Sequence, residues 1–341
     1  MTAAASLIGV SPVAARRARV RPPRHRGPVR LAVLCTALTV VAGCGSGSAG
    51  DDAGRSSSAA PLAGCSTEST VNAMGASLLP IPPAAVTLID AGAQPTAVAT
   101  GSPDLARAQN VRLVTTSASS STSEGQPRSD TAQTVDLPLT ARTLCTDPTD
   151  VELELGAASS PDPDLSTSLA AVRESKAGLA VAGGSVPISL RIVPAAAADD
   201  AARSAVEQSL VQALQRSVTL PREPIGVGAR WRAVRTIDGA ATVTQTITAT
   251  LRERTGDTLT VDVQVDEEPV DSVFRIPGST QTLTIASFSM SGTGSMTIDL
   301  SRGLPSAGEL TVRGGRSLVG ADPARPLVQQ TSTAIRWETI R

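Results

Sequence analysis

Residues Val243–Val265 read VTQTITATLRERTGDTLTVDVQV, and this stretch decides the fold class. Val243, Ile247, Ala249 and Leu251 alternate with threonines before the Gly256-Asp257 pair, and Leu259, Val261, Val263 and Val265 alternate with polar residues after it. Such alternation predicts two half-buried strands, and the Gly-Asp pair predicts a turn between them. The stretch is therefore typical of an antiparallel hairpin with one dry face and one wet face.

The same alternation continues outward from this hairpin. It recurs in Val151–Leu155, in Val186–Val193 and, with a change of face after Ile285, in Thr282–Ser291. A change of face within one strand predicts a β-bulge. Repeated short strands separated by turn residues predict antiparallel meanders over most of the chain.

One segment reads as a helix instead. Asp199 and Asp200 suit the positive N-terminal end of a helix dipole, and Pro221 follows its last turn. The apolar stripe at helical spacing consists of Ala202, Val206, Leu210, Ala213 and Leu214. The sequence therefore predicts an α+β fold, in which curved antiparallel β-meander sheets pack against one main amphipathic helix.

The folded body is expected over residues 65–341, as one domain or as two intimately packed pseudo-halves, 65–193 and 194–341. A weak internal similarity favours two halves, because Thr140–Leu155 and Thr248–Val263 both have the pattern of a strand, a turn and a second strand. Any two meander hairpins share that pattern, so both organisations stay open.

Near the N-terminus, Leu31–Cys44 reads LAVLCTALTVVAGC and follows seven arginines. A basic front, a short apolar core and small residues at the end are typical of a secretory signal. The core is well short of the roughly 20 apolar residues needed to span a bilayer. We therefore expect residues 1–43 to be a signal peptide that sends the rest of the chain out of the cytoplasm.

The end of this stretch, Val41-Ala42-Gly43-Cys44, resembles the lipobox of bacterial lipoproteins. The resemblance implies cleavage between Gly43 and Cys44 and acylation of the Cys44 thiol, which would hold the protein on the outer face of the cell membrane. The Gly- and Ser-rich residues that follow predict a flexible tether over 44–64. The alternative is an ordinary signal with a chance cysteine.

Composition excludes several function classes. Seven of the 30 Lys and Arg residues precede Cys44, which leaves 23 against 31 Asp and Glu and a net charge of −8. An acidic body argues against nucleic acid and against anionic lipid headgroups as partners. The only histidine, His25, lies in the signal, and the chain has no tyrosine. Histidine-based catalysis and histidine metal sites are thereby removed, so we expect no enzyme activity, no metal and no cofactor.

Two cysteines remain after the signal and the anchor are set aside, Cys65 and Cys145. Two leftover thiols in an exported protein most simply form a disulfide. The alternative is a pair of buried free thiols.

Weaker patterns have simpler structural explanations. Gly226-Val-Gly228 is half of a phosphate-binding loop, but it leads into a strand. The pairs Asp162/Asp164 and Asp147/Asp150 are typical of turns, because they lack the ligand density of a calcium loop. Glu152 and Glu154 share the expected wet face of one strand. The four aromatic residues after the signal include Trp231 and Trp337, which we expect to fill the core.

Two further runs, Leu220–Trp231 and Ser291–Leu300, resemble a family of uncharacterised secreted actinobacterial lipoproteins. The likeness covers residues 85–341 and implies no activity or catalytic residues. The leading hypothesis is a non-enzymatic protein that binds a lipid or another apolar envelope molecule between sheet and helix. The alternatives are an envelope scaffold or protein-interaction module, and a hydrolase that uses acidic residues.

Overall fold

The computed structural model describes residues 64–70, 73, 76–182 and 186–340, and the structural statements below concern these residues. The expected signal peptide, its cleavage site at Gly43 and Cys44, and nearly all of the expected tether lie outside them. No helix in the described part of the chain is long and apolar enough to cross a membrane.

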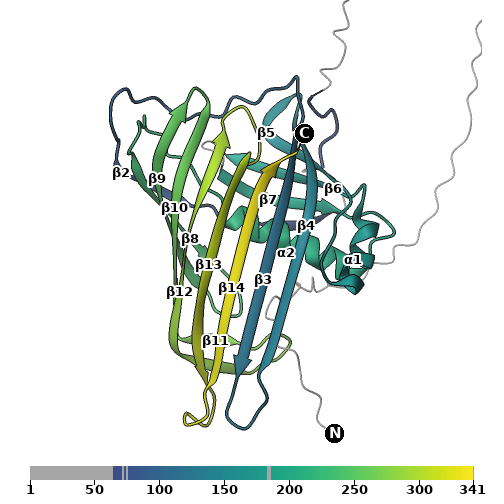
Figure 1. Cartoon of the computed structure of the whole chain (residues 1–341), viewed down its shortest axis with the longest axis vertical. Coiled ribbons are helices and arrows are strands. Elements are labelled where there is room, and N and C mark those ends of the chain that lie inside the picture. The colour runs from purple at the N-terminus through teal and green to yellow at the C-terminus, as the bar shows by residue number, and fades with distance from the viewer. Residues whose placement is uncertain (1–63, 71–72, 74–75, 183–185, 341) are drawn as a thin grey trace, which may run out of the picture. The chain divides into compact units, whose positions relative to one another are not determined.

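Fourteen strands form one antiparallel sheet (Figure 1). The strands are β1 (Ser77–Pro80), β2 (Ala85–Asp90), β3 (Gln109–Thr122), β4 (Ser129–Leu144), β5 (Asp147–Leu155), β6 (Lys176–Ala182), β7 (Val186–Val193), β8 (Arg230–Ile237), β9 (Val243–Thr255), β10 (Thr258–Pro269), β11 (Val273–Arg275), β12 (Thr282–Asp299), β13 (Ala307–Val319) and β14 (Leu327–Thr339). The hairpin expected around Gly256-Asp257 is confirmed as β9 and β10, and the bulge expected after Ile285 lies in β12.

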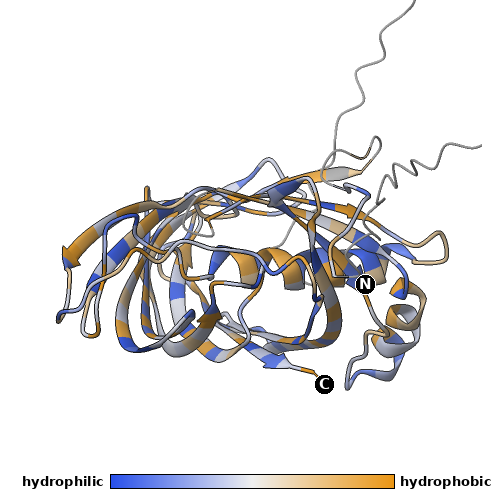
Figure 2. Ribbon diagram, turned by 90° about the horizontal axis from the view of Figure 1, so that it is seen from above, coloured by the Kyte–Doolittle hydropathy of each residue, from blue (hydrophilic) through white to orange (hydrophobic). Residues whose placement is uncertain are grey.

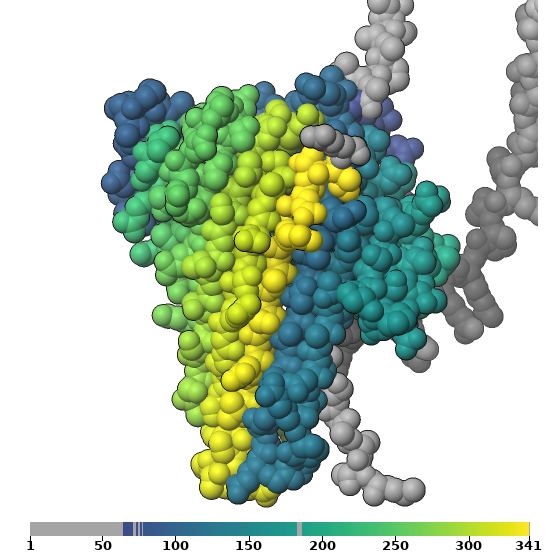
Figure 3. All heavy atoms as spheres, viewed as in Figure 1, coloured from purple at the N-terminus to yellow at the C-terminus, as the bar shows by residue number. Residues whose placement is uncertain are grey.

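The sheet curls until its two edges approach each other. Its order is β1-β7-β6-β5-β4-β3-β14-β13-β12-β10-β9-β8-β2, with β11 added beside β12. The edge strands β1 and β2 are consecutive in the chain and are joined by only four residues, 81–84. Such a link spans at most about 17 Å, so the edges stay close although thirteen strands run from one to the other. The strands β3 and β14, which are far apart in the sequence, are neighbours in the middle of the sheet (Figure 3).

Glycines allow a close approach between the neighbouring strands β12 and β13. A Cβ on Gly294 would overlap the backbone at Glu309, and a Cβ on Gly314 would overlap the backbone at Ser289. Only a residue without a side chain fits so close an approach.

The helix α2 (Asp200–Gln215) lies inside this curve (Figure 2). Its N-cap Asp199 accepts a hydrogen bond of 2.8 Å from the backbone N–H of Ala202. The apolar stripe expected from the sequence is buried along its whole length, and α2 contacts β3, β4 and β7. A second short helix, α1 (Pro163–Leu169), continues into a 3-10 turn, Ala170–Val172.

The expected α+β class is therefore wrong. The described residues form a nearly all-β protein, a single open antiparallel sheet with two short helices, and α2 does not form a separate covering layer. Alternation shows which side of each strand is dry, but it does not show how many strands join one sheet. Here the sheet turns its own dry side inward, and the helix adds only part of the packing. Strands from residues 65–193 and from 194–341 take part in this one sheet.

Two apolar clusters fill the inside of the curve. The main core surrounds α2 and includes Leu113, Leu137, Leu210 and Trp231. The second cluster consists of Ala241, Val243, Phe274, Ile285 and Leu318, and β11 carries Phe274 into it. A band of polar side chains lies on the inner face next to both clusters.

The segment 64–70 is fastened to β4 and β5. A disulfide joins Cys65 to Cys145 with a Cα–Cα distance of 5.1 Å, as one of the two alternatives predicted. The backbone N–H of Thr70 donates a hydrogen bond of 2.7 Å to Glu152. Glu152 is consequently buried rather than solvated as expected, because this segment covers its side of β5.

Candidate functional site

A continuous row of cross-strand partners carries the inner polar band. We call it the polar row, and from β8 to β4 it consists of Arg235, Gln245, Glu267, Met290, Gly314, Thr331, Ser119 and Thr131. Each residue lies opposite the next on the neighbouring strand. Because directly opposite residues share one face of a sheet, all eight positions belong to the inner face.

The charged end of this row occupies positions that alternation assigns to the core. Arg235 lies between buried Ala233 and half-buried Ile237, and Glu267 follows buried Val265 on its strand. Gln245 separates Val243 from Ile247 in the same way. The sequence analysis missed these three residues. The signal was available, because one polar residue stands at an inward position on three consecutive strands.

Glu267 is the carboxylate at the centre of the band. Its Oε1 lies 3.3 Å from Nη2 of Arg216, the C-cap residue of α2. The same oxygen accepts a hydrogen bond of 3.0 Å from Nε2 of Gln245. The side chains of Arg216 and Glu267 are 11% and 7% exposed. This is a largely desolvated ion pair, in which the carboxylate oxygen is already shared by two donors.

Arg235 is a buried cation without a carboxylate partner among the described residues. It is 3% exposed, and its one hydrogen bond is a long one of 3.5 Å from Nη2 to Oγ1 of Thr219. Its Nε and Nη1 are buried and contact no acceptor. Burial, together with the positive charge of Arg216, lowers the pKa of Arg235 to about 10.

A third arginine, Arg316 on β13, completes the group. Its guanidinium lies 4.3 Å from the ring centroid of Phe274, which is a cation–π contact. Its Nε donates a hydrogen bond of 2.8 Å to Oε1 of Gln329, whose Nε2 donates one of 3.3 Å to Ser121. Burial lowers the pKa of Arg316.

A pocket of about 240 Å³ opens in this band. Its wall includes the charged residues Arg216, Arg316 and Glu267. Phe288 and Met290 supply apolar surface, and the Met290 Sδ accepts a hydrogen bond of 3.3 Å from the Thr331 hydroxyl. We call this space the arginine pocket. It combines an excess of positive charge with an apolar side.

A second hollow of about 730 Å³ lies on the other face of the long strands, and we call it the outer groove. Small side chains leave the space: Ala118, Ser120, Ala132, Gly315 and Ser332. Arg313 borders it, as does an exposed ion pair of 2.8 Å between Arg128 and Asp130. Figure 3 shows how β12, β13, β14, β3 and β4 lie side by side on this face.

The predicted aromatic core residues are confirmed. Trp231 is fully buried, and its Nε1 donates a hydrogen bond of 2.8 Å to the carbonyl of Thr219. Trp337 is 3% exposed. Gly226, from the partial phosphate-loop pattern, packs tightly against the backbone at Ala93, so that run makes a close turn before β8.

The carboxylates that the sequence places in pairs have separate structural roles. Asp162 caps α1 by accepting hydrogen bonds from the N–H groups of Asp164 and Leu165. Asp147 and Asp150 lie in β5 rather than in the expected turn, which falls at residues 145–146. No group of three or more potential metal ligands occurs within the described ranges.

Glu154 is also separated from its expected partner. It is exposed and lies 3.3 Å from Arg142, whereas Glu152 is buried under the segment 64–70. The two carboxylates therefore do not face a common space, and they are not arranged for paired acid–base chemistry.

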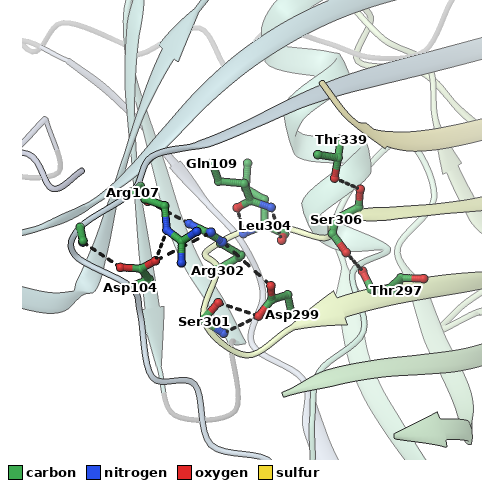
Figure 4. Close-up of polar contacts among 11 residues, drawn as sticks. Asp104, Arg107, Gln109, Thr297, Asp299, Ser301, Arg302, Leu304, Ser306 and Thr339 are labelled. Carbon is green, nitrogen blue, oxygen red and sulfur yellow. Dashed lines mark hydrogen bonds and ion pairs between the residues drawn. The ribbon is translucent and has the colours of Figure 1, made fainter. Parts of the chain in front are cut away.

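A polar cluster at the far end of the long strands ties the turn after β12 to the chain before β3 (Figure 4). Arg302 donates a hydrogen bond of 2.9 Å to the carbonyl of Arg107 and lies within 3.9 Å of Asp299 and 3.8 Å of Asp104. Gln109 exchanges two hydrogen bonds with the backbone of Leu304. These donors are used within the cluster, which holds the loops in place.

No protein-family model matches the chain, and no curated protein matches it either.

Proposed function

We propose that this protein is a lipid-anchored, extracytoplasmic binding protein without catalytic activity, whose ligand is a lipid or another apolar envelope molecule. The observation that carries the proposal is the arginine pocket, a space of about 240 Å³ on the inner face, beside the second apolar cluster. Concave sites with an apolar wall and a few polar groups are typical of small-molecule binding. The proposed ligand is small, since about 240 Å³ lies below the usual range of roughly 300–1,000 Å³ for such sites.

Co-purification tests the bound ligand directly. The full-length protein is purified from membranes, the non-covalent lipid is extracted, and the extract is analysed by mass spectrometry. We expect one apolar species at near-stoichiometric amounts. In Ala240→Leu the larger side chain would take up part of the pocket, so the affinity should fall roughly tenfold, or about 1.4 kcal/mol, and less ligand should co-purify.

The matched control is Ala324→Leu, which adds the same atoms at an exposed turn. Equal occupancy in all three proteins, or no ligand in the unchanged protein, would overturn ligand binding in this pocket.

The anchor is tested separately. We expect labelled palmitate to be incorporated into the unchanged chain and not into Cys44→Ser, which should leave the membrane fraction. If Cys44→Ser stays as firmly attached as the unchanged chain, the anchoring part of the proposal is wrong.

The outer groove favours a second candidate function, an envelope scaffold or protein-interaction module. Its volume of about 730 Å³ exceeds that of the arginine pocket, and charged residues border it. A photo-crosslinking residue at Ser332 should then trap one partner, and Arg313→Glu should abolish the product. The same probe at exposed Thr258 is the control. Identical products from both positions would reject this function.

A further inference from the structure

We propose that the arginine pocket binds an anionic oxygen group, a carboxylate or a phosphate, as the polar end of an amphiphilic ligand. The inference deepens the proposed binding function and rests on it. What carries it is the juxtaposition of three arginines with one carboxylate on the inner face.

The charges do not balance without a further anion. Arg216 and Arg316 line the pocket; Arg235 is not part of its wall, but it lies on β8 opposite Gln245, whose other neighbour in the polar row is Glu267. Glu267 is the one acidic residue in the pocket wall, and it is paired with Arg216. A group of three guanidinium ions and one carboxylate carries two excess positive charges. Buried cations are normally paired, so the site calls for an anion.

Buried hydrogen-bond donors without an acceptor also indicate an anion site. Arg235 is 97% buried, and its Nε and Nη1 contact no acceptor. The Nε of Arg216 is likewise buried without an acceptor. A guanidinium matches the two oxygens of a carboxylate or phosphate with two parallel N–H donors. No protein group in the described part of the chain satisfies these donors, and an oxyanion held by Arg216 and Arg316 would supply acceptors at the pocket wall.

The apolar side of the pocket favours an amphiphile over a free ion. Phe288 and Met290 are part of its wall, and Val243 connects the wall to the second apolar cluster. A ligand with an anionic end and a short apolar part would match both kinds of surface. Inorganic phosphate shares only the anionic chemistry, so the experiment compares the two sources.

The test is calorimetric titration of the full-length, lipid-anchored protein in nanodiscs of neutral phospholipid, with empty discs as the reference. The probes are hexanoate, hexanol and inorganic phosphate. We expect hexanoate to bind at least about tenfold more tightly than hexanol. Arg235→Met and Arg316→Met should each weaken hexanoate binding about tenfold, since neither change leaves a carboxylate without its partner. Hexanol binding should not change.

Arg313→Met is the matched control, because it removes the same charge from β13 at an exposed position bordering the outer groove. Arg316→Lys guards against misfolding, and its affinity should be intermediate, since lysine keeps the charge but not the planar fork.

Displacement of hexanoate by equimolar phosphate would assign a free oxyanion, and failure of displacement would assign the amphiphile; both support the anion site. Equal binding of hexanoate and hexanol, or equal losses in Arg313→Met and Arg316→Met, would overturn it.

Failure of the anion site can be distinguished from failure of the proposed binding function. An apolar species that co-purifies but carries no anionic group would remove the anion site and leave ligand binding intact. Absence of any co-purifying species would remove ligand binding itself.

Discussion

Arg216 and Glu267 form an ion pair of 3.3 Å in which both side chains are almost fully removed from solvent. Arg216 ends α2, whereas Glu267 lies near the end of β10, so the pair fastens the enclosed helix to the sheet. Arg235, which has no carboxylate partner among the described residues, is close enough for the charge of Arg216 to lower its pKa. Substitution of Glu267 and substitution of Arg235 should therefore change the stability of the protein in opposite directions.

Glu267→Gln should destabilise the protein strongly. The change leaves the positive charge of Arg216 buried without its partner, beside a second cation. Breaking a buried pair in this way costs about 3–5 kcal/mol. The measurement is the free energy of unfolding from urea titration at neutral pH. Glu268→Gln, the exposed neighbour, is the control and should stay within about 0.5 kcal/mol. Equal losses in both variants would contradict a special role for the pair.

Arg235→Met should stabilise the protein after dialysis into a buffer without oxyanions. Burial and Arg216 lower the pKa of Arg235 to about 10, which corresponds to a penalty of about 3 kcal/mol on the charged form. The folded pKa is below the unfolded value, so the penalty is complete below pH 10 and fades as the pH rises from there toward the unfolded pKa.

At neutral pH we therefore expect a gain of about 1–3 kcal/mol in the free energy of unfolding for Arg235→Met. Arg232→Met, an exposed change on the same strand, should have almost no effect. A lower stability of Arg235→Met than of Arg232→Met would show that the arginine is already satisfied.

Removal of the disulfide should lower stability without abolishing the sheet. The Cys65–Cys145 bond spans 80 positions of sequence and holds the segment 64–70 against β4 and β5. The double change Cys65→Ser and Cys145→Ser should cost about 2–5 kcal/mol in urea unfolding. A reductant should destabilise the unchanged protein by a similar amount and leave the double variant unaffected. A response of the double variant to reductant would assign the effect elsewhere.

Two carboxylates on β5 should give opposite pH dependences. Burial is the largest cause of the raised pKa of Asp150, whereas hydrogen bonds from Thr149 lower the pKa of Asp147. The stability from Asp150 is present at low pH and is lost as the pH rises through its folded pKa. The stability from Asp147 is present near neutral pH and is lost as the pH falls through its folded pKa.

Accordingly, Asp150→Asn should raise the free energy of unfolding near neutral pH, and Asp147→Asn should lower it. Both differences should shrink when unfolding is measured below the pKa of the respective group. Parallel responses of the two variants between pH 3 and pH 7 would refute the assignment.

Much of the local structure could be predicted from the sequence. The hairpin of β9 and β10, the bulge in β12, the buried stripe of α2 and the burial of Trp231 follow from spacing and residue type. The candidate site was not found in that way. Arg235, Gln245 and Glu267 each interrupt the alternation of one strand once, and these interruptions indicate a common site only when the three strands are compared with one another.

The sequence by itself determined which side of each strand is dry, where the helix runs and which two cysteines were free to pair, because these depend on neighbours a few residues apart or on composition. Only the tertiary structure decided that the sheet curls around α2 and that Gln245 and Arg216 meet at the carboxylate of Glu267. That meeting depends on strand order and register, which bring together residues as far apart as Ser119 and Thr331. The same packing removes these side chains from water. Residue types that are ordinarily found on the surface therefore line a buried, positively charged pocket here.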